Sequence, residues 1–286
     1  MYNPSTALST HHPMNNTALA QDRVTSFDGT QLHLQCLKQG SANATPIVFL
    51  HALAMQASMW GRLVEHVNVD APIWGLDLRG HGASDHPPGP YSSELFARDV
   101  LAVLDHLKAP QVHLVGCSMG GTVSMAFTGR HPTRVKSLGL IDTTACYGEN
   151  AKDAWEKRGQ QGHRQGLASL RDFQVERWFS PEFAQTHTDV VEDCLNVFVA
   201  NTTSAYLETC RMLGAADERE FIKNYQGACT IVVGEEDYAT PVSMAQELAT
   251  LLPQADLHIL KNVRHYSPVQ APEMIAPLLL NLFKKA

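Results

Sequence analysis

The sequence predicts an α/β fold with a mostly parallel sheet and helices on both faces. From residue 22 onward, short continuous apolar runs alternate with stretches of helical periodicity. Continuous apolar runs are typical of strands covered on both faces, and helices between them provide the crossover connections that parallel strands need. One stretch, residues 150–224, breaks the alternation because it has helical periodicity and no convincing strand.

Eight strands are expected. Residues 23–40 hold two alternating runs around an Asp28-Gly29 turn, which predicts a β-hairpin. The other six strands are the apolar runs PIVFLHAL, PIWGLDL, VHLVGC, SLGLIDT, CTIVVGEED and LHILKNV. Pro277 is expected to kink the last helix or to move its start. The main helical patterns between and after these runs lie at 56–67, 91–108, 121–130, 241–252 and 271–284.

This order predicts a core of residues 22–149 and 225–286, with residues 150–224 as a helical cap inserted after strand 6. A cap there would lie over the carboxyl ends of the strands, where open α/β sheets place their sites. Residues 1–21 are rich in Ser, Thr, Asn and Pro and are expected to form a disordered tail. His11 and His12 in this tail are interpreted as a solvated pair, not a metal site.

Composition argues against several classes of function. The formal net charge is −7 and no basic block occurs, so nucleic-acid binding is not expected. No apolar run approaches the roughly 18 residues of a membrane span, so no membrane partner is expected. The six scattered cysteines lack metal-binding spacing and indicate reduced thiols in a cytoplasmic protein. The expected partner is a small molecule, and the oligomeric state stays open.

A G-x-S-x-G pattern stands where a buried strand passes into a helix. Gly116 and Gly120 flank Ser118 in VHLVGCSMGG. A β-carbon at either glycine would clash at a sharp strand-to-helix corner, and the corner residue is expected to be strained. This nucleophile elbow would raise the Ser118 hydroxyl into a site facing the positive end of the helix dipole. The alternative is a glycine-rich turn whose serine only caps the helix.

A neutral serine needs a base, and the base needs a carboxylate that fixes its tautomer. In this architecture the order along the chain is Ser, acid, His. His265 follows the last strand and is the expected base. Among Glu235, Glu236 and Asp237, the last lies deepest in its turn and is preferred. Asp142, after the preceding strand, is the alternative acid, and its other possible role is to cap or hold a loop.

Backbone groups complete the predicted site. The N–H of Met119, after the nucleophile, and that of Leu53, in the loop after IVFL, are the expected oxyanion donors. His51 is interpreted as an anchor of that loop and not as a catalyst. The loop LDLRGHGASD is interpreted as a structural turn, not a metal site, although it carries Asp77, Arg79 and His81.

Together these segments resemble the α/β-hydrolase superfamily, and VERWFSPEFA, AYLETCRMLGAADERE and LGLIDTTA resemble its 3-oxoadipate enol-lactonases. The resemblance implies hydrolysis of an ester or lactone through an acyl-enzyme, with no cofactor and no metal. It also supports Trp155 and Arg158 as an aromatic and a cation that bind a substrate carboxylate at the cap. An ordinary amphipathic helix with a solvated Arg158 is the alternative, and both interpretations stay open.

Some positions depart from the related families. The oxyanion loop has Ala52 and Ala54 within His-Ala-Leu-Ala, where enol-lactonases commonly have Asn-Ser-Leu-Gly, so the exact substrate stays open. Cys117 and Tyr266 stand where carbon–carbon bond hydrolases of aromatic degradation usually have Asn and an aromatic residue, often Trp. Ser118 argues against dehalogenases and epoxide hydrolases, which use Asp there. A general carboxylesterase, a carbon–carbon bond hydrolase and a hydrolase-fold ligand receptor are the alternatives.

Overall fold

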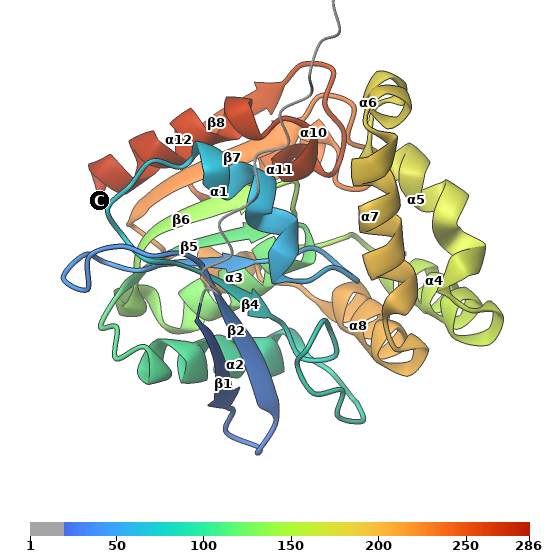
Figure 1. Ribbon diagram of the computed structural model, residues 1–286, viewed down its shortest axis with the longest axis horizontal. Helices are drawn as coiled ribbons and strands as arrows, with labels where there is room; N and C mark the ends of the chain where they lie inside the picture. The colour runs from blue at the N-terminus through green and yellow to red at the C-terminus, as the bar shows by residue number, and fades with distance from the viewer. Residues whose placement is uncertain (1–19) are drawn as a thin grey trace, which may run out of the picture.

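The computed structural model describes residues 20–286, and residues 1–19 of the predicted tail, with His11 and His12, lie outside them. The tail boundary at residue 21 is wrong, because Gln21 already pairs with Gln35 in the first strand. The predicted eight-stranded sheet is confirmed, with strand order β1-β2-β4-β3-β5-β6-β7-β8 (Figure 1). The strands are β1 (Gln21–Thr25), β2 (Gln31–Lys38), β3 (Ile47–Leu50), β4 (Ile73–Asp77), β5 (Val112–Cys117), β6 (Val135–Ile141), β7 (Ala228–Gly234) and β8 (Asp256–Leu260).

The sheet is mostly parallel, as predicted. β1 and β2 form the antiparallel hairpin, and β2 pairs antiparallel with β4, while every pairing from β4 to β8 is parallel. The hairpin turns at Gly29, whose φ of +90° suits a residue without a side chain. The carboxyl ends of β3 to β8 therefore meet at one edge of the sheet, where their loops can build a site.

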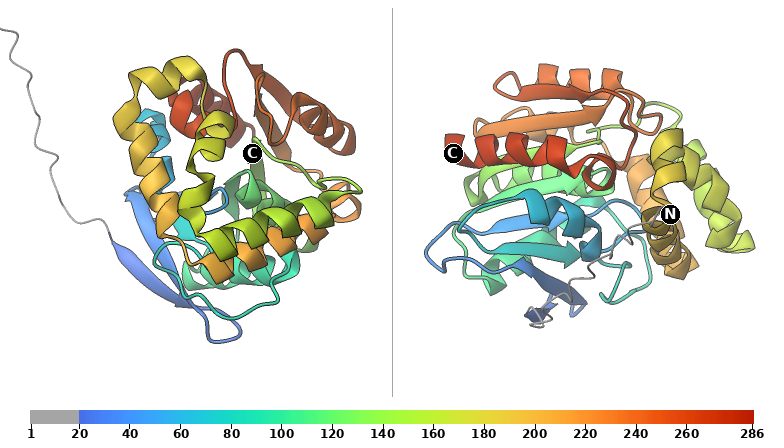
Figure 2. Two further views of the ribbon diagram at one scale, coloured as in Figure 1. Left: turned by 90° about the vertical axis from the view of Figure 1, so that its right-hand side faces the viewer. Right: turned by 45° about the horizontal axis from the view of Figure 1, so that its top comes forward.

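Helices cover both faces of this sheet. α1 (Gly61–His66) and α12 (Pro272–Lys285) pack together on one face, and α2 (Ser93–His106) and α3 (Met119–Arg130) pack on the other (Figure 2). The expected helices at 56–67, 91–108, 121–130, 241–252 and 271–284 all occur, with bounds within two residues at each end when the 3-10 turn at 57–60 is counted together with α1. The remaining helices of the core are α10 (Val242–Leu251), the short α11 (Ser267–Gln270) and the 3-10 turns η1 (Ala57–Trp60) and η2 (Pro132–Arg134).

The expectation for Pro277 is partly wrong. α12 keeps its start at Pro272 and continues through Pro277 to Lys285. A proline inside a helix removes one N–H donor, which here leaves the Glu273 carbonyl without its usual partner. Pro277 and Glu273 are both exposed, so water can reach that carbonyl and the helix need not end.

The strand and helix that meet at Ser118 form the centre of the core. Every residue of β5 is buried, as a strand flanked by β3 and β6 and covered by helices must be. α3 is almost entirely buried as well, because it lies between the sheet and α2 and has no broad solvent face. Such a helix needs small residues where it meets the sheet, and its first residues are Met119, Gly120 and Gly121.

All elements between β6 and β7 are helices, and we call α4–α8 the cap helices. They gather at one side of the molecule, next to the carboxyl ends of the strands (Figures 1 and 2). α4 and α8 pack closely along each other because Gly159 faces Leu207 and Cys210 of α8 without a side chain between them. The segment comprises α4 (Ala151–Gln165), η3 (Leu167–Leu170), α5 (Arg171–Trp178), α6 (Pro181–Thr186), α7 (Thr188–Ala200), α8 (Thr203–Ala215) and α9 (Arg219–Ile222).

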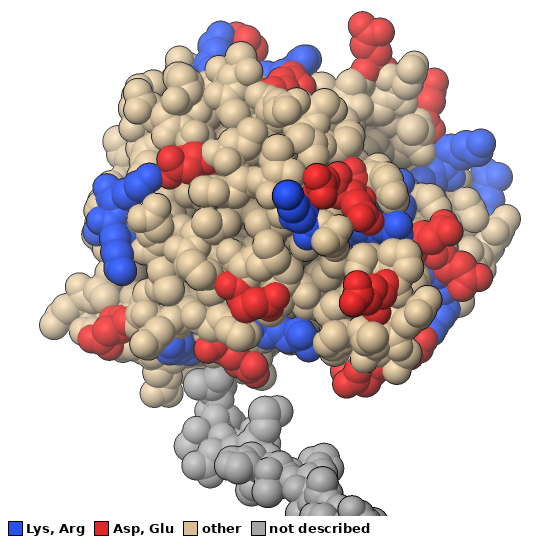
Figure 3. All heavy atoms as spheres, turned by 90° about the horizontal axis from the view of Figure 1, so that it is seen from above, with Lys and Arg blue, Asp and Glu red and all other residues tan. Residues whose placement is uncertain are grey.

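Charges of both signs are interspersed on the face seen in Figure 3. Charged side chains on the surface also form exposed ion pairs, such as Arg211 with Glu156 and Arg219 with Asp217. Among residues 20–286, none of the helices combines the length and the apolar character that crossing a membrane requires. Each of the six cysteines is a free thiol.

The corner between β5 and α3 predicts a stability difference between two glycines. A β-carbon on Gly120 would lie 2.1 Å from the Leu50 carbonyl oxygen, whereas one on Gly61 meets nothing within 4 Å. We expect Gly120→Ala to lower the free energy of unfolding by about 3 kcal/mol through overpacking. Gly61→Ala, in a helical conformation, should raise it by about 0.4–1 kcal/mol. Urea unfolding of both variants tests this, and equal stabilities would contradict the tight corner.

Candidate active site

Ser118 occupies the sharp corner that the sequence predicts. Its backbone has φ +53° and ψ −117°, a conformation that costs energy for a residue with a side chain. β5 ends one residue before it and α3 begins one residue after it. A β-carbon on Gly116 would lie 2.2 Å from the Gly120 carbonyl oxygen, which confirms the clash expected at these glycines. The Ser118 side chain does not cap α3, so the capping alternative is wrong.

The structure brings Ser118, His265 and Asp237 together in one hydrogen-bonded chain. The Ser118 Oγ lies 2.9 Å from His265 Nε2, and His265 Nδ1 lies 2.8 Å from Asp237 Oδ2. A carboxylate only accepts hydrogen bonds, so Nδ1 carries the proton and Nε2 is free to accept from the serine. The three residues are 5%, 6% and 3% exposed, respectively. They come from the loops after β5, β8 and β7.

Asp237 is held as an ionised carboxylate. Its Oδ1 accepts the backbone N–H groups of Ala239 at 2.7 Å and Thr240 at 2.9 Å, and its Oδ2 accepts the Thr240 hydroxyl at 2.8 Å. Burial by itself raises the pKa of Asp237, but the facing His265 and these hydrogen bonds outweigh it and hold the pKa below its ordinary value. A permanent negative charge therefore faces Nδ1 at neutral pH.

Asp142, the alternative acid, holds two loops together and does not contact the histidine side chain. Its Oδ1 accepts the Gly234 N–H at 3.1 Å, and its Oδ2 bonds the Ser267 hydroxyl at 2.6 Å. Burial and the nearby Asp237 charge raise the pKa of Asp142 well above its ordinary value, which favours the neutral form. The loops after β6, β7 and β8 are thereby joined beneath the site.

The two predicted oxyanion donors are the backbone N–H groups of Met119 and Leu53. Met119 is the first residue of α3, where helical N–H groups have no intrahelical partner. Leu53 lines the same cleft as Ser118 and His265. Among the described residues, the Leu53 N–H has no hydrogen-bond acceptor, so this group is free for a ligand.

His51 anchors the loop that carries Leu53. Its Nδ1 donates to the Ala52 carbonyl at 2.8 Å, and its Nε2 accepts the Leu78 N–H at 3.0 Å. It therefore joins the loops after β3 and β4. His51 is fully buried, and burial lowers its pKa, which keeps the ring in the neutral form that this pattern requires. The side chain does not contact the serine, as the anchoring interpretation implies.

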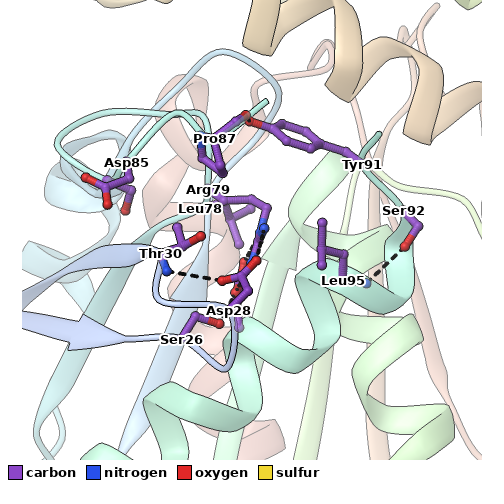
Figure 4. A network of polar contacts seen from close by, with 12 residues as sticks. Ser26, Asp28, Thr30, Leu78, Arg79, Asp85, Pro87, Tyr91, Ser92 and Leu95 are labelled. Atoms are coloured by element: carbon purple, nitrogen blue, oxygen red, sulfur yellow. Dashed lines mark hydrogen bonds and ion pairs between the residues drawn. The ribbon is translucent and has the colours of Figure 1, made fainter. Parts of the chain in front are cut away.

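The polar residues of the loop after β4 bind other protein groups. Arg79 is 1% exposed and forms ion pairs with the buried Asp99 and, at 3.0 Å, with Asp28 (Figure 4). Asp77 accepts the Ala57 N–H at 2.6 Å, and His81 Nδ1 bonds the Arg79 carbonyl at 3.0 Å. Within residues 20–286, no group of three or more acidic, His or Cys side chains could hold a metal ion.

Trp155 and Arg158 of α4 both line the cleft over Ser118. Arg158 donates through Nε to the Tyr206 hydroxyl at 3.0 Å and through a terminal nitrogen to Gln174 at 3.3 Å. Its guanidinium lies 4.9 Å from the centre of the Trp155 ring. Its partners in the described chain are thus neutral, and no carboxylate lies within ion-pair distance. The Arg158 side chain is half-buried, so it contacts these neutral cap groups and solvent together.

A second cleft cation, Arg177 of α5, was not predicted from the sequence. It lines the same cleft, lies over Phe173 at 5.0 Å, and has no carboxylate within 4.0 Å among residues 20–286. Burial and the neighbouring Arg158 charge lower the pKa of Arg177, and the Asp237 charge offsets this only in part. The spacing of Phe173 and Arg177 is that of one helical turn, but it does not show that the pair faces the site.

The space around Ser118 has two parts. Directly over the serine the cavity holds only about 20 Å³. Beyond Arg158 and Arg177 it widens into a vestibule of about 590 Å³ between α4, α5 and the loop after β7. The vestibule is lined mainly by apolar groups and by Lys157, Arg158 and Arg177, without an acidic side chain. Positive charge is therefore concentrated at the mouth of the site.

Comparison with known proteins fits this geometry. The model of the alpha/beta hydrolase fold family matches residues 45–272. The chain belongs to the α/β-hydrolase fold family. The family match and the hydrolase relatives identify the chain as a hydrolase. The predicted fold class is confirmed.

Relatives confirm the resemblance to enol-lactonases. The chain is 30% identical to 3-oxoadipate enol-lactonase 2 of Acinetobacter baylyi, over 82% of this chain and 86% of the relative. The crystal structure of the enol-lactonase from Burkholderia xenovorans LB400 superimposes with a TM-score of 0.87 at 27% identity, covering 92% of this chain and all of that one. A 2-hydroxy-6-oxononadienedioate/2-hydroxy-6-oxononatrienedioate hydrolase of Burkholderia vietnamiensis is 26% identical over 90% of this chain and 93% of the relative.

The hydrogen-bonded chain predicts different roles for the two aspartates. Asp237→Asn should lower kcat for hydrolysis of an activated ester by roughly 10³–10⁴-fold, because an amide facing Nδ1 favours the wrong histidine tautomer. Asp142→Asn should cost less than about tenfold, since Asp142 only supports the loops. Steady-state kinetics with p-nitrophenyl acetate measures both. Equal losses in the two variants would contradict the assignment of Asp237.

Proposed function

We propose that this protein is a serine hydrolase that opens a carboxylate-bearing lactone through an acyl-enzyme, with an enol-lactone of the 3-oxoadipate type as the best candidate. The observation that carries the proposal is the buried Ser118–His265–Asp237 chain beneath a cleft lined by two arginines without acidic partners. The similarity to enol-lactonases supports the choice of a lactone.

In the first half of the proposed reaction, His265 Nε2 takes the Ser118 proton while Oγ attacks the lactone carbonyl carbon. Asp237 stabilises the imidazolium that results. The N–H groups of Met119 and Leu53 bind the oxygen that becomes negative. The tetrahedral intermediate then expels the ring oxygen, so the ring opens and the acyl group stays on Ser118. The leaving enolate takes the proton from His265 Nε2 and becomes a ketone, which returns His265 to its neutral form and makes reclosure unfavourable.

In the second half, a water molecule gives a proton to His265 Nε2 and its oxygen attacks the acyl carbon. The same N–H groups bind the second oxyanion. Collapse breaks the bond to Ser118 Oγ, which regains its proton from His265, and the product is a carboxylic acid that loses its proton to solvent at neutral pH. Each step uses groups of this chain and one water molecule.

The charge of the cleft favours an anionic substrate over a neutral ester. Arg158 and Arg177 line the cleft together, and their mutual repulsion is not relieved by any acidic side chain among those that line it. A substrate carboxylate would accept charge-assisted hydrogen bonds from these guanidiniums. Trp155 offers an apolar wall beside them. This feature favours a lactonase of the proposed type over a general carboxylesterase, which would gain nothing from cations there.

Replacing the proposed nucleophile tests the enzyme class. Ser118→Ala should lower hydrolysis of p-nitrophenyl acetate by more than about 10⁴-fold, because removal of one triad member abolishes covalent catalysis. Turnover by the parent protein should show a pre-steady-state burst, and mass spectrometry of the intact protein should detect an acyl adduct. Both signals should be absent in Ser118→Ala. Turnover that persists in Ser118→Ala would refute the proposal. If the parent protein itself shows no turnover, the ligand receptor is favoured.

The two cleft arginines predict a split in substrate preference. Arg158→Ala and Arg177→Ala should each raise KM for a carboxylated lactone by about 10–100-fold, the value of a hydrogen bond to a charged group. KM for the neutral p-nitrophenyl acetate should change by less than about threefold, since no charge is lost. Arg171→Ala is the control, because Arg171 pairs with Glu192 on the cap surface. Equal effects on both substrates would exclude carboxylate binding.

A further inference from the structure

The loop that carries Leu53 forms a tight turn with an unfavourable residue at its third position. The Met55 N–H donates to the Ala52 carbonyl at 3.1 Å and closes a four-residue turn. Ala54, its third residue, has φ +58°. A turn with positive φ at this position is typical of type II, where glycine is strongly preferred. Ala54 is fully buried, so its methyl group cannot be relieved by moving into solvent.

Three consecutive carbonyl groups of this turn accept hydrogen bonds from side chains. Ala52 accepts from His51 at 2.8 Å and Leu53 from the Tyr266 hydroxyl at 3.5 Å. Ala54 accepts from Asn201 Nδ2 at 2.8 Å. His51 and Tyr266 belong to the core, next to β3 and to His265. Asn201 comes from the cap, directly after α7.

The position of the Asn201 side chain is set by the end of its helix. Nδ2 also lies 2.8 Å from the Val197 carbonyl oxygen and 3.2 Å from that of Phe198, both in the last turn of α7. Three carbonyl oxygens around one atom identify it as the nitrogen, because an amide oxygen there would only repel them. Its Oδ1 is buried and has no hydrogen-bond partner among the described residues. The hydrogen bonds that the nitrogen donates therefore set the position of the amide.

We propose that Asn201 is a positioning residue that holds the oxyanion turn in its active conformation and couples it to the cap. The proposal rests on the proposed function, since it assigns an oxyanion role to the Leu53 N–H. Without the bond from Asn201, the Ala54 carbonyl would be released and Ala54 would relax to negative φ. Because φ at Ala54 sets the path of the chain through the turn, this change would break the Met55–Ala52 hydrogen bond and displace Leu53 together with its N–H.

The nearest alternative is that Asn201 only attaches the cap to the core. Thr202 provides a matched control, because its hydroxyl lies 2.7 Å from His86 Nδ1 and also bridges cap and core. That contact ends on the loop after β4 and does not involve the oxyanion turn. Its side chain makes no capping bond to α8. Thr202→Val therefore removes a neighbouring cap contact and leaves Ala54 in place.

The experiment compares kcat and KM for p-nitrophenyl acetate in Asn201→Ala, Asn201→Ala with Ala54→Gly, Ala54→Gly alone and Thr202→Val. Asn201→Ala should lower kcat by about 10–100-fold with KM within about threefold, because losing an oxyanion donor completely costs 10²–10³. Adding Ala54→Gly should restore most of kcat, since glycine adopts positive φ without support. Thr202→Val should stay within about threefold of the parent, and Ala54→Gly alone gives the reference kcat with which the restored kcat of the double variant is compared.

Each outcome decides the question. An unchanged kcat in Asn201→Ala, a loss that glycine does not restore, or an equal loss in Thr202→Val would overturn the proposal. If Asn201→Ala unfolds below the assay temperature, Asn201→Ser takes its place, because its hydroxyl can still donate to the Val197 carbonyl but is too short to bridge to Ala54. Failure of the proposed function is a separate result. It would be shown by turnover that persists in Ser118→Ala, independently of the kcat values of the Asn201 variants.

Discussion

The close approach of β5 and α3 is the constraint on which the rest of the site depends. Ser118 can point out of the corner only because the backbone takes a positive φ there and because glycines stand two residues to either side. The same corner brings the first N–H of α3 beside the hydroxyl and seats the helix against the end of β3. Ser118, the start of α3 and the chain that follows β3 are therefore positioned by one packing arrangement.

The two buried aspartates differ in protonation because their shared region stabilises only one ionised carboxylate. Asp237 and Asp142 approach the same region from β7 and β6, and the Asp237 charge raises the energy of ionising Asp142. Asp237 has the histidine and two backbone N–H groups to stabilise its charge, while Asp142 favours its neutral form and joins the loops beneath. Two chemically identical side chains thus take opposite protonation preferences because their surroundings differ.

Features that depend on neighbouring residues could be predicted from the sequence. The elbow, the strand order along the chain and the helix bounds follow from glycine spacing and periodicity, and the structure places Ser118, Asp237 and His265 together as the motif order predicts. Features that distant segments decide could not. Arg177 reaches the cleft only through the path of the cap helices, and Asn201 meets Ala54 across 147 positions of sequence. Pro277 stays helical because it faces water, which periodicity alone did not reveal.

The narrowness of the cavity over Ser118 has a further consequence. A space of about 20 Å³ accommodates roughly one water molecule and no five-membered ring. Any lactone that reaches the serine must first spread the aromatic and guanidinium side chains above it. A measured affinity therefore includes the free energy of opening as well as the attraction between the lactone and the walls. A variant that loosens these side chains can bind more tightly even though it offers the lactone no additional partner.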